Sequence, residues 1–172
     1  MFNSRNPSHR DPLGAVPQEQ PVHFRITVDR DLHCSAAYLH IIRDGSANEE
    51  KYGMFWCGMN GNDREWWECH YIPQDPGLYF YYFTIDTWNG SLSLQRARFG
   101  PGGQSTLEHT GLLWQLTVYE KDFSTPDWLS GGILYQIFPD RFYYSGKPKG
   151  PLPWGRTMHQ SWEESPEWGP NA

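Results

Sequence analysis

The chain has 172 residues, enough for one ordinary domain with an appendage but too few for a complete eight-stranded α/β barrel of about 250 residues. Its formal net charge of −6 argues against a nucleic-acid-binding protein, because such proteins rely on clustered lysine and arginine side chains. Aromatic residues make up 16% of the sequence, more than a small core requires, so some rings are expected at a surface or an interface.

The first twenty residues are polar and contain three prolines. They lack the apolar segment of a secretory signal, and no stretch of the sequence approaches the roughly 18 apolar residues of a membrane span. We therefore expect residues 1–20 to be a disordered or extended lead, and we expect no membrane partner. An odd number of cysteines, three, favours reduced thiols and a cytoplasmic location.

Seven short segments with the composition of β-strands lie between residues 21 and 120. Apolar and polar side chains alternate with period two in several of them, and turn-rich segments separate them. The pair Asn89-Gly90 predicts a tight hairpin. The predicted strands are residues 22–28, 37–43, 50–56, 65–72, 78–86, 91–95 and 112–119. Their spacing predicts an all-β fold, an immunoglobulin-like antiparallel β-sandwich over residues 21–120.

A different kind of segment follows a linker predicted at residues 121–130. The apolar run Ile133–Phe138 has the length and composition of a parallel strand that is buried on both faces, and Pro139 ends it. Such a strand needs neighbours, but the sequence after Tyr143 is rich in proline and glycine and predicts no further stable element. Residues 131–172 therefore predict the start of a truncated domain.

The octapeptide Tyr135-Gln-Ile-Phe-Pro-Asp-Arg-Phe142 resembles the first barrel strand of the alpha-amylase family, glycoside hydrolase family 13. The sandwich, chiefly through Gly77–Phe83, is similar to the N-terminal module of neopullulanase-like and cyclomaltodextrinase-like enzymes, carbohydrate-binding module family 34. The resemblance implies an N-terminal fragment of an enzyme that hydrolyses α-glucosidic bonds in starch, maltodextrin or pullulan. Residues 131–172 would then begin a (β/α)8 barrel, most of which is missing from this sequence.

The resemblance also assigns the barrel-strand motif to individual residues. These are Tyr135, Gln136, Pro139, Asp140, Arg141 and Phe142. For Asp140 and Arg141 it implies a structural salt link at the barrel rim more than a catalytic role. Some relatives carry a calcium loop after this strand, but residues 143–149 here offer lysines where oxygen ligands would be needed. We therefore expect no cofactor and no metal site in this chain, while calcium in the intact enzyme stays open although this segment disfavours it.

No catalytic residue is predicted in this chain. Retaining glycosidases need two carboxylates roughly 5 Å apart, and none of the later family motifs that carry them occurs in the sequence. The acidic residues within 63–68 and within 163–167 are interpreted as solvated surface charge. The chain by itself is therefore predicted to be catalytically inactive.

Outward-facing rings are the candidates for sugar binding, because the apolar face of a pyranose packs on a flat aromatic ring. Strand alternation places Trp66 and Tyr82 on outer faces, and Trp88 lies in the predicted hairpin. These three residues are the predicted contacts with an α-glucan or maltodextrin. Two alternatives stay open for the same rings, namely packing on the missing barrel and contact with a second subunit in a homodimer. The competing interpretation of the chain is a stand-alone carbohydrate-binding or protein-interaction module.

Overall fold

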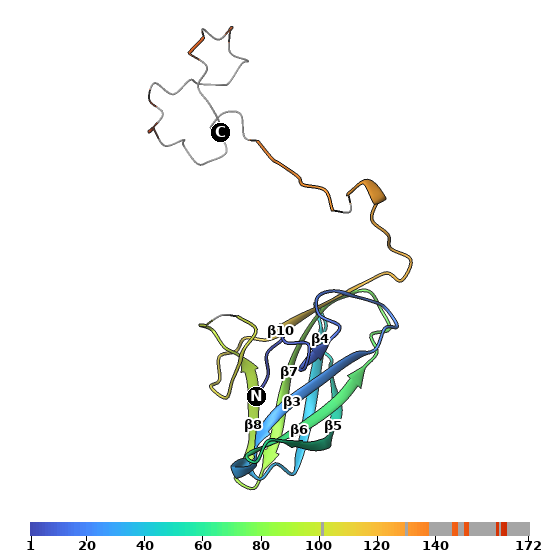
Figure 1. Ribbon diagram of the computed structural model, residues 1–172, viewed down its shortest axis with the longest axis vertical. Coiled ribbons are helices and arrows are strands. Elements are labelled where there is room, and N and C mark those ends of the chain that lie inside the picture. The colour runs from blue at the N-terminus through green and yellow to red at the C-terminus, as the bar shows by residue number, and fades with distance from the viewer. Residues whose placement is uncertain are drawn as a thin grey trace. The chain divides into compact units, whose positions relative to one another are not determined.

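A computed structural model describes residues 1–100, 102–129 and 131–137, and residues 146, 147, 150, 151, 161, 163 and 164. The chain divides into two compact units between Thr125 and Pro126. The first unit is built of β-strands (Figure 1). Within the part of the chain that the structure describes, no helix is long and apolar enough to cross a membrane.

The ten strands among the described residues include all seven of the predicted segments, so the all-β prediction is confirmed. Their bounds are β1 Arg10–Asp11, β2 Val16–Pro17, β3 Val22–Asp29, β4 Ala36–Arg43, β5 Glu49–Asn60, β6 Arg64–Tyr71, β7 Gly77–Thr87, β8 Gly90–Arg96, β9 Ser105–Thr106 and β10 Trp114–Tyr119. Two short 3-10 turns complete the description, η1 at Arg30–Leu32 and η2 at Asp127–Leu129.

The strands form a curled antiparallel sandwich of the immunoglobulin-like kind. On one side β1, β3 and β6 pair in that order, and on the other β4, β7, β10 and β2 do so, with β8 beside the second half of β7. Strand β5 belongs to both sides, because Glu49–Met54 pair with β4 and Phe55–Asn60 pair with β6. Among the described strands, only the short pairing of β2 with β10 is parallel.

Period-two alternation explains the core. In β3 and β7 every second side chain is apolar and fully or almost fully buried, while the residues between them face outward. An aromatic cluster occupies the centre, where the Phe24 ring lies 4.9 Å from that of Tyr81 and the Tyr81 ring lies 5.7 Å from that of Trp114. The indole of Trp114 donates to the carbonyl of Gly103 over 2.9 Å, so its buried N–H is satisfied.

The predicted disordered or extended lead is instead part of the sandwich. Phe2 is 3% exposed, and its ring lies 4.8 Å from that of Trp114. Val16 is fully buried and pairs with Val118 at the parallel end of β10. Phe2 and Val16 are isolated apolar residues in a polar segment, so the sequence shows no periodic pattern there. The free energy gained by burying these two side chains nevertheless outweighs the tendency of their polar neighbours to stay in solvent. The compact unit therefore starts at Met1 and not at residue 21.

The predicted barrel strand is not formed in the described part of its range. Residues 131–137 carry no strand, and Ile133 and Leu134 are 94% and 80% exposed. No described residue after Tyr119 belongs to a strand, and residues 131–137 take part in none of the strand pairings among the described residues. The expected strand residue Phe138 and the motif residues Pro139, Asp140, Arg141 and Phe142 lie outside the described residues.

Candidate functional site

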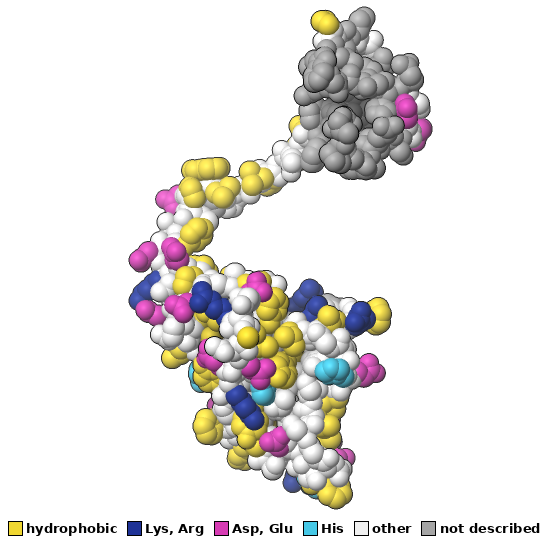
Figure 2. All heavy atoms as spheres, turned by 180° about the vertical axis from the view of Figure 1, so that it is seen from behind, with side chains coloured by type: hydrophobic (Ala, Val, Ile, Leu, Met, Phe, Trp, Pro, Cys, Tyr) yellow, Lys and Arg dark blue, Asp and Glu magenta, His cyan; other side chains and the backbone are white. Residues whose placement is uncertain are grey.

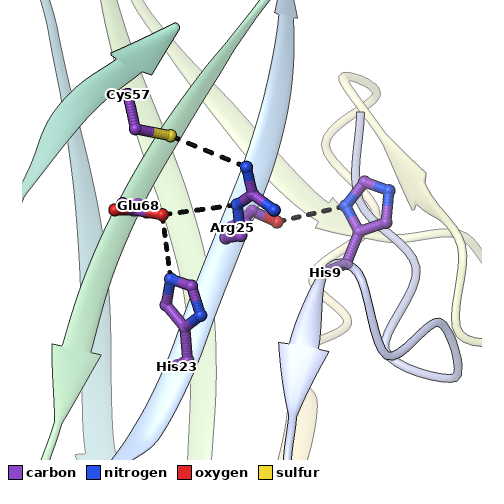
Figure 3. Close-up of polar contacts among 5 residues, drawn as sticks. All are labelled: His9, His23, Arg25, Cys57 and Glu68. Carbon is purple, nitrogen blue, oxygen red and sulfur yellow. Dashed lines mark hydrogen bonds and ion pairs between the residues drawn. The ribbon is translucent and has the colours of Figure 1, made fainter. Parts of the chain in front are cut away.

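A polar cluster covers the outer face of β3, β5 and β6, and Glu68 is at its centre (Figure 3). The Glu68 carboxylate lies 3.0 Å from Nε2 of His23 and 3.4 Å from Nε of Arg25. Arg25 also donates to the sulfur of Cys57 over 3.8 Å, and the carbonyl oxygen of Arg25 lies 3.1 Å from Nδ1 of His9. We call these five residues the outer-face cluster.

Electrostatics hold Glu68 in its ionised form. Partial burial by itself raises the pKa of this carboxyl, but hydrogen bonds from His23 and Cys57 and the positive charges of His23 and Arg25 outweigh burial, so the pKa is lowered. An ionised carboxylate already engaged with the Arg25 guanidinium and the His23 imidazole is a poor general acid. The outer-face cluster therefore supports a structural role more than chemistry.

Trp66 lies on the outer face, as predicted, but against two residues of the outer-face cluster. The guanidinium of Arg25 is 4.3 Å from the centre of its ring, a cation–π contact, and the ring of His9 is 5.3 Å away. Trp66 is only partly exposed. Because protein groups already lie against its ring, Trp66 is less suited to stacking on a sugar than its position in the strand suggests.

Tyr82 lies on the outer face of the other sheet. The ring of His40 stacks on it with centroids 4.5 Å apart, and the Tyr82 hydroxyl donates to Glu49 over 3.1 Å. Burial, followed by the hydrogen bond to Glu49, raises the pKa of Tyr82 to about 12. Since β6 and β7 belong to opposite sheets, Trp66 and Tyr82 point away from each other and cannot contact one short ligand together.

Trp88 is the predicted residue with an open ring. It is 75% exposed in the turn between β7 and β8, where the Thr87 hydroxyl donates to the carbonyl of Gly90 over 2.7 Å and accepts from the backbone N–H of Asn89 over 3.2 Å. The ring of His33 meets that of Trp88 edge to face, with centroids 5.9 Å apart. A fixed turn thus presents an indole beside an imidazole.

A hollow of about 520 Å³ opens next to His33, and we call it the end hollow. It lies where η1 approaches the turn between β5 and β6, at the same end of the sandwich as the β7–β8 hairpin (Figure 1). Its lining residues are Arg30, Asp31, His33, Cys34, Asn62, Asp63 and Glu65. Sequence reasoning assigned Asp63 and Glu65 to solvated surface charge and missed the hollow.

Backbone and side-chain contacts fix the walls of the end hollow. The N–H of Arg30 donates to the carbonyl of Asp63 over 2.9 Å and ties η1 to the β5–β6 turn. Beside this contact, Arg64 forms a 2.7 Å ion pair with Asp29. The N–H of Ser35 donates to the carbonyl of Asp86 over 2.8 Å and ties the segment after η1 to β7. Contacts from three parts of the fold therefore hold the hollow open.

Hydrogen-bond acceptors remain available in the end hollow. Among the described residues, the side chains of Asp31, Asn62 and Asp63 make no hydrogen bond, whereas Glu65 accepts one from the indole of Trp67 over 3.0 Å. Burial, and then the charge of Glu65, raises the pKa of the Cys34 thiol to about 11, which keeps it protonated. The hollow thus offers acceptors and no activated nucleophile. The described residues contain no group of side chains arranged to hold a metal ion.

A smaller hollow of about 390 Å³ lies where β5 leaves β6 to join β4. It is lined by Tyr52, Gly53, Phe55, Glu68, Cys69 and His70. The ring of His70 stacks on that of His23 at 4.4 Å, so this hollow borders the outer-face cluster.

The face of the molecule in Figure 2 shows acidic, basic and apolar side chains interspersed over the sandwich.

Comparison with known proteins gives the chain its relatives. No family model matches the sequence. An amylopullulanase of Thermoanaerobacterium thermosulfurigenes is 33% identical over 138 residues, which cover 78% of this chain and 7% of that protein. An amylopullulanase of Thermoanaerobacter thermohydrosulfuricus is 28% identical over 174 residues, which cover 96% of this chain and 12% of that protein. A solved cyclomaltodextrinase structure matches 80% of this chain and 24% of its own, with 24% identity and a TM-score of 0.45.

The fold is that of an immunoglobulin-like β-sandwich module, and the sequence relatives indicate the protein family to which it is related. The chain is a partial, neopullulanase-like relative of the alpha-amylase family, glycoside hydrolase family 13, as its barrel-strand motif predicts. It spans about a tenth of the length of the two curated relatives described above. Of the motif, Tyr135 and Gln136 lie among the described residues, and both are exposed.

Proposed function

We propose that the chain is the N-terminal part of a glycosidase that hydrolyses α-glucosidic bonds in starch, maltodextrin or pullulan. The observation that carries this proposal is the match of 96% of the chain to a protein named amylopullulanase. The motif that starts at Tyr135, directly after the sandwich and linker, agrees with it. The exposed apolar segment Ile133–Ile137 favours this interpretation over a stand-alone module, because a finished binding module has no use for it.

The module itself is proposed to be non-catalytic. Glu68 is ionised and paired, and the end hollow provides no nucleophile activated by a base. The test is an assay for reducing sugar released from soluble starch by the purified chain. We expect none above the level of a heat-denatured sample. Reproducible release that fractionates with the protein would overturn the non-catalytic assignment.

Glucan binding is the role that the surface of the sandwich supports best. The open indole of Trp88 beside a polar hollow provides the two elements of a sugar site, a flat ring and hydrogen-bonding groups. Titration calorimetry with maltoheptaose tests this role.

Packing against a catalytic barrel and pairing of two subunits are the other proposed roles, and sedimentation of the chain tests the pairing of subunits. Reduced cysteines remain the argument for the proposed cytoplasmic location.

A further inference from the structure

We propose that Trp88 and the end hollow form one binding site for a neutral α-glucan. In this site the indole of Trp88 stacks on one glucose ring, and the side chains of Asp31, Asn62 and Asp63 accept hydrogen bonds from the hydroxyls of a neighbouring glucose. The inference rests on the proposed glucan-binding role and assigns a place to it. It also replaces the predicted set of Trp66, Trp88 and Tyr82, of which only Trp88 is retained.

The contact between His33 and Trp88 joins the two parts of the site. His33 lines the hollow, and its ring meets the indole at an angle of 85° with the centroids 5.9 Å apart. The indole therefore stands at the rim of the hollow and is not an isolated surface ring. A volume of about 520 Å³ falls within the ordinary range of small-molecule sites and is ample for a pyranose.

The chemistry of the lining selects the ligand. Sugar hydroxyls need acceptors, and three side chains of the hollow have acceptor oxygens with no protein donor among the described residues. The lining carries the carboxyls of Asp31, Asp63 and Glu65 against the single guanidinium of Arg30. An excess of negative charge disfavours phosphorylated or carboxylated sugars and leaves a neutral glucan as the fitting ligand.

The site is also preorganised. The η1 turn is tied to the β5–β6 turn through Arg30 and Asp63, and the β7–β8 turn is closed by Thr87. A rigid site loses little conformational freedom on binding, so weak individual contacts with hydroxyls still contribute to affinity. The contact that ties η1 to the β5–β6 turn uses the backbone of Arg30 and Asp63, which leaves the side chains of Asp31 and Asp63 available to a ligand.

Titration calorimetry of the 172-residue chain with maltoheptaose tests the site through two substitutions. Trp88→Ala removes the stacking ring, and Asp63→Ala removes a carboxylate while keeping the backbone carbonyl that holds η1. We expect each variant to bind about tenfold more weakly than the unaltered chain. Trp128→Ala and Asp122→Ala are matched controls, because Trp128 is 77% exposed and both residues follow the last strand. The controls should bind like the unaltered chain.

The outcomes separate the site from the function. If the chain binds maltoheptaose and both Trp88→Ala and Asp63→Ala bind equally well, with unchanged circular dichroism, the site is overturned and glucan binding stands. If the unaltered chain gives no heat at millimolar concentrations, glucan binding itself is overturned. A phosphorylated maltooligosaccharide should bind more weakly than its neutral counterpart, and equal or tighter binding would contradict the role of the carboxylates.

Discussion

The ring of Phe2 lies 4.8 Å from the ring of Trp114 at an interplanar angle of 74°, inside the core. This contact joins the first residues of the chain to its last long strand. It is reinforced by the N–H of Thr27, which donates to the carbonyl of Met1 over 2.8 Å. The polar lead, residues 1–20, is therefore a structural element of the sandwich, and its removal should destabilise the whole sandwich.

We expect Phe2→Ala to destabilise the protein by about 3–5 kcal/mol, because it leaves a cavity among Tyr81, Phe83 and Trp114. Urea unfolding followed by tryptophan fluorescence measures the change. Phe99→Ala is the control, since Phe99 is 85% exposed and its truncation should change stability by less than about 0.5 kcal/mol. Equal stabilities of the two variants would show that the lead does not pack as described.

Gly103 should tolerate alanine poorly for two separable reasons. Its φ of +79° disfavours any side chain, and an added Cβ would lie 2.8 Å from Oδ1 of Asn3. Gly111, with φ of +69° and no atom within 4 Å of the position that a Cβ would occupy, isolates the backbone effect. We expect Gly111→Ala to cost about 1 kcal/mol and Gly103→Ala clearly more in thermal unfolding. If Gly103→Ala and Gly111→Ala destabilise the protein equally, the segment around Asn3 can shift to make room for the added Cβ.

The ion pairs of Glu68 should make a small, pH-dependent contribution to stability. Glu68→Gln is expected to cost about 0.5–1 kcal/mol at neutral pH, since the pair is partly exposed. The folded protein lowers the pKa of Glu68, so its contribution is present above the ordinary value of 4.5 and is lost as the pH falls through the lower folded value. Denaturant unfolding across this range should show the two proteins converging toward acid.

The control for that experiment is Glu108→Gln, at an exposed carboxylate without an ion pair among the described contacts. It should leave stability unchanged at every pH tested. A difference between Glu68→Gln and the unaltered chain that widens toward acid would contradict the assigned direction of the Glu68 pKa.

Alkylation should distinguish the three thiols. Cys57 is exposed, whereas Cys69 is buried and burial raises its pKa to about 12. We expect iodoacetamide to label Cys57 first, with Cys34 and Cys69 reacting far more slowly, as read by mass spectrometry of peptides. Burial also raises the pKa of Cys57, so its labelling should still accelerate above pH 9.0. Cys57→Ser should abolish the fast phase, and equal rates at all three thiols would refute the burial pattern.

The strands were predictable from sequence because each carries a local signal. Alternation in residues 22–28 and 78–86 reappears as β3 and β7. The predicted hairpin also forms, but one residue earlier than expected, because Trp88 and Asn89 make the turn and Gly90 already pairs with Thr87. Local alternation also placed Trp66 on the outer face, but it could not show that Arg25, on another strand, covers the ring. Alternation within a strand predicts on which face of the sheet a side chain lies. The side chains that it contacts on other strands depend on which strands pair and in which register, and alternation does not give this.

The end hollow and the packed lead could not be read from the sequence for the same reason. Arg30 and Asp63 are far apart along the chain and meet only because β3 and β6 pair in register, with Asp29 opposite Arg64. The burial of Phe2 likewise depends on Trp114, at the other end of the sandwich sequence. The strand expected at Ile133–Phe138 is not formed in residues 133–137, although their local composition favours a strand. Among the described residues these five pair with no other strand, and a strand forms only where a partner is present.

The crossing of β5 from one sheet to the other has a consequence for how the sandwich opens. One continuous backbone supplies ladder hydrogen bonds to β4 through residues 49–54 and to β6 through residues 55–60. Detaching either sheet pulls on the shared strand and breaks pairing in the other. The amides of β4 and β6 should therefore exchange with deuterium through the same rare, global event, and the module should behave as a single cooperative foldon.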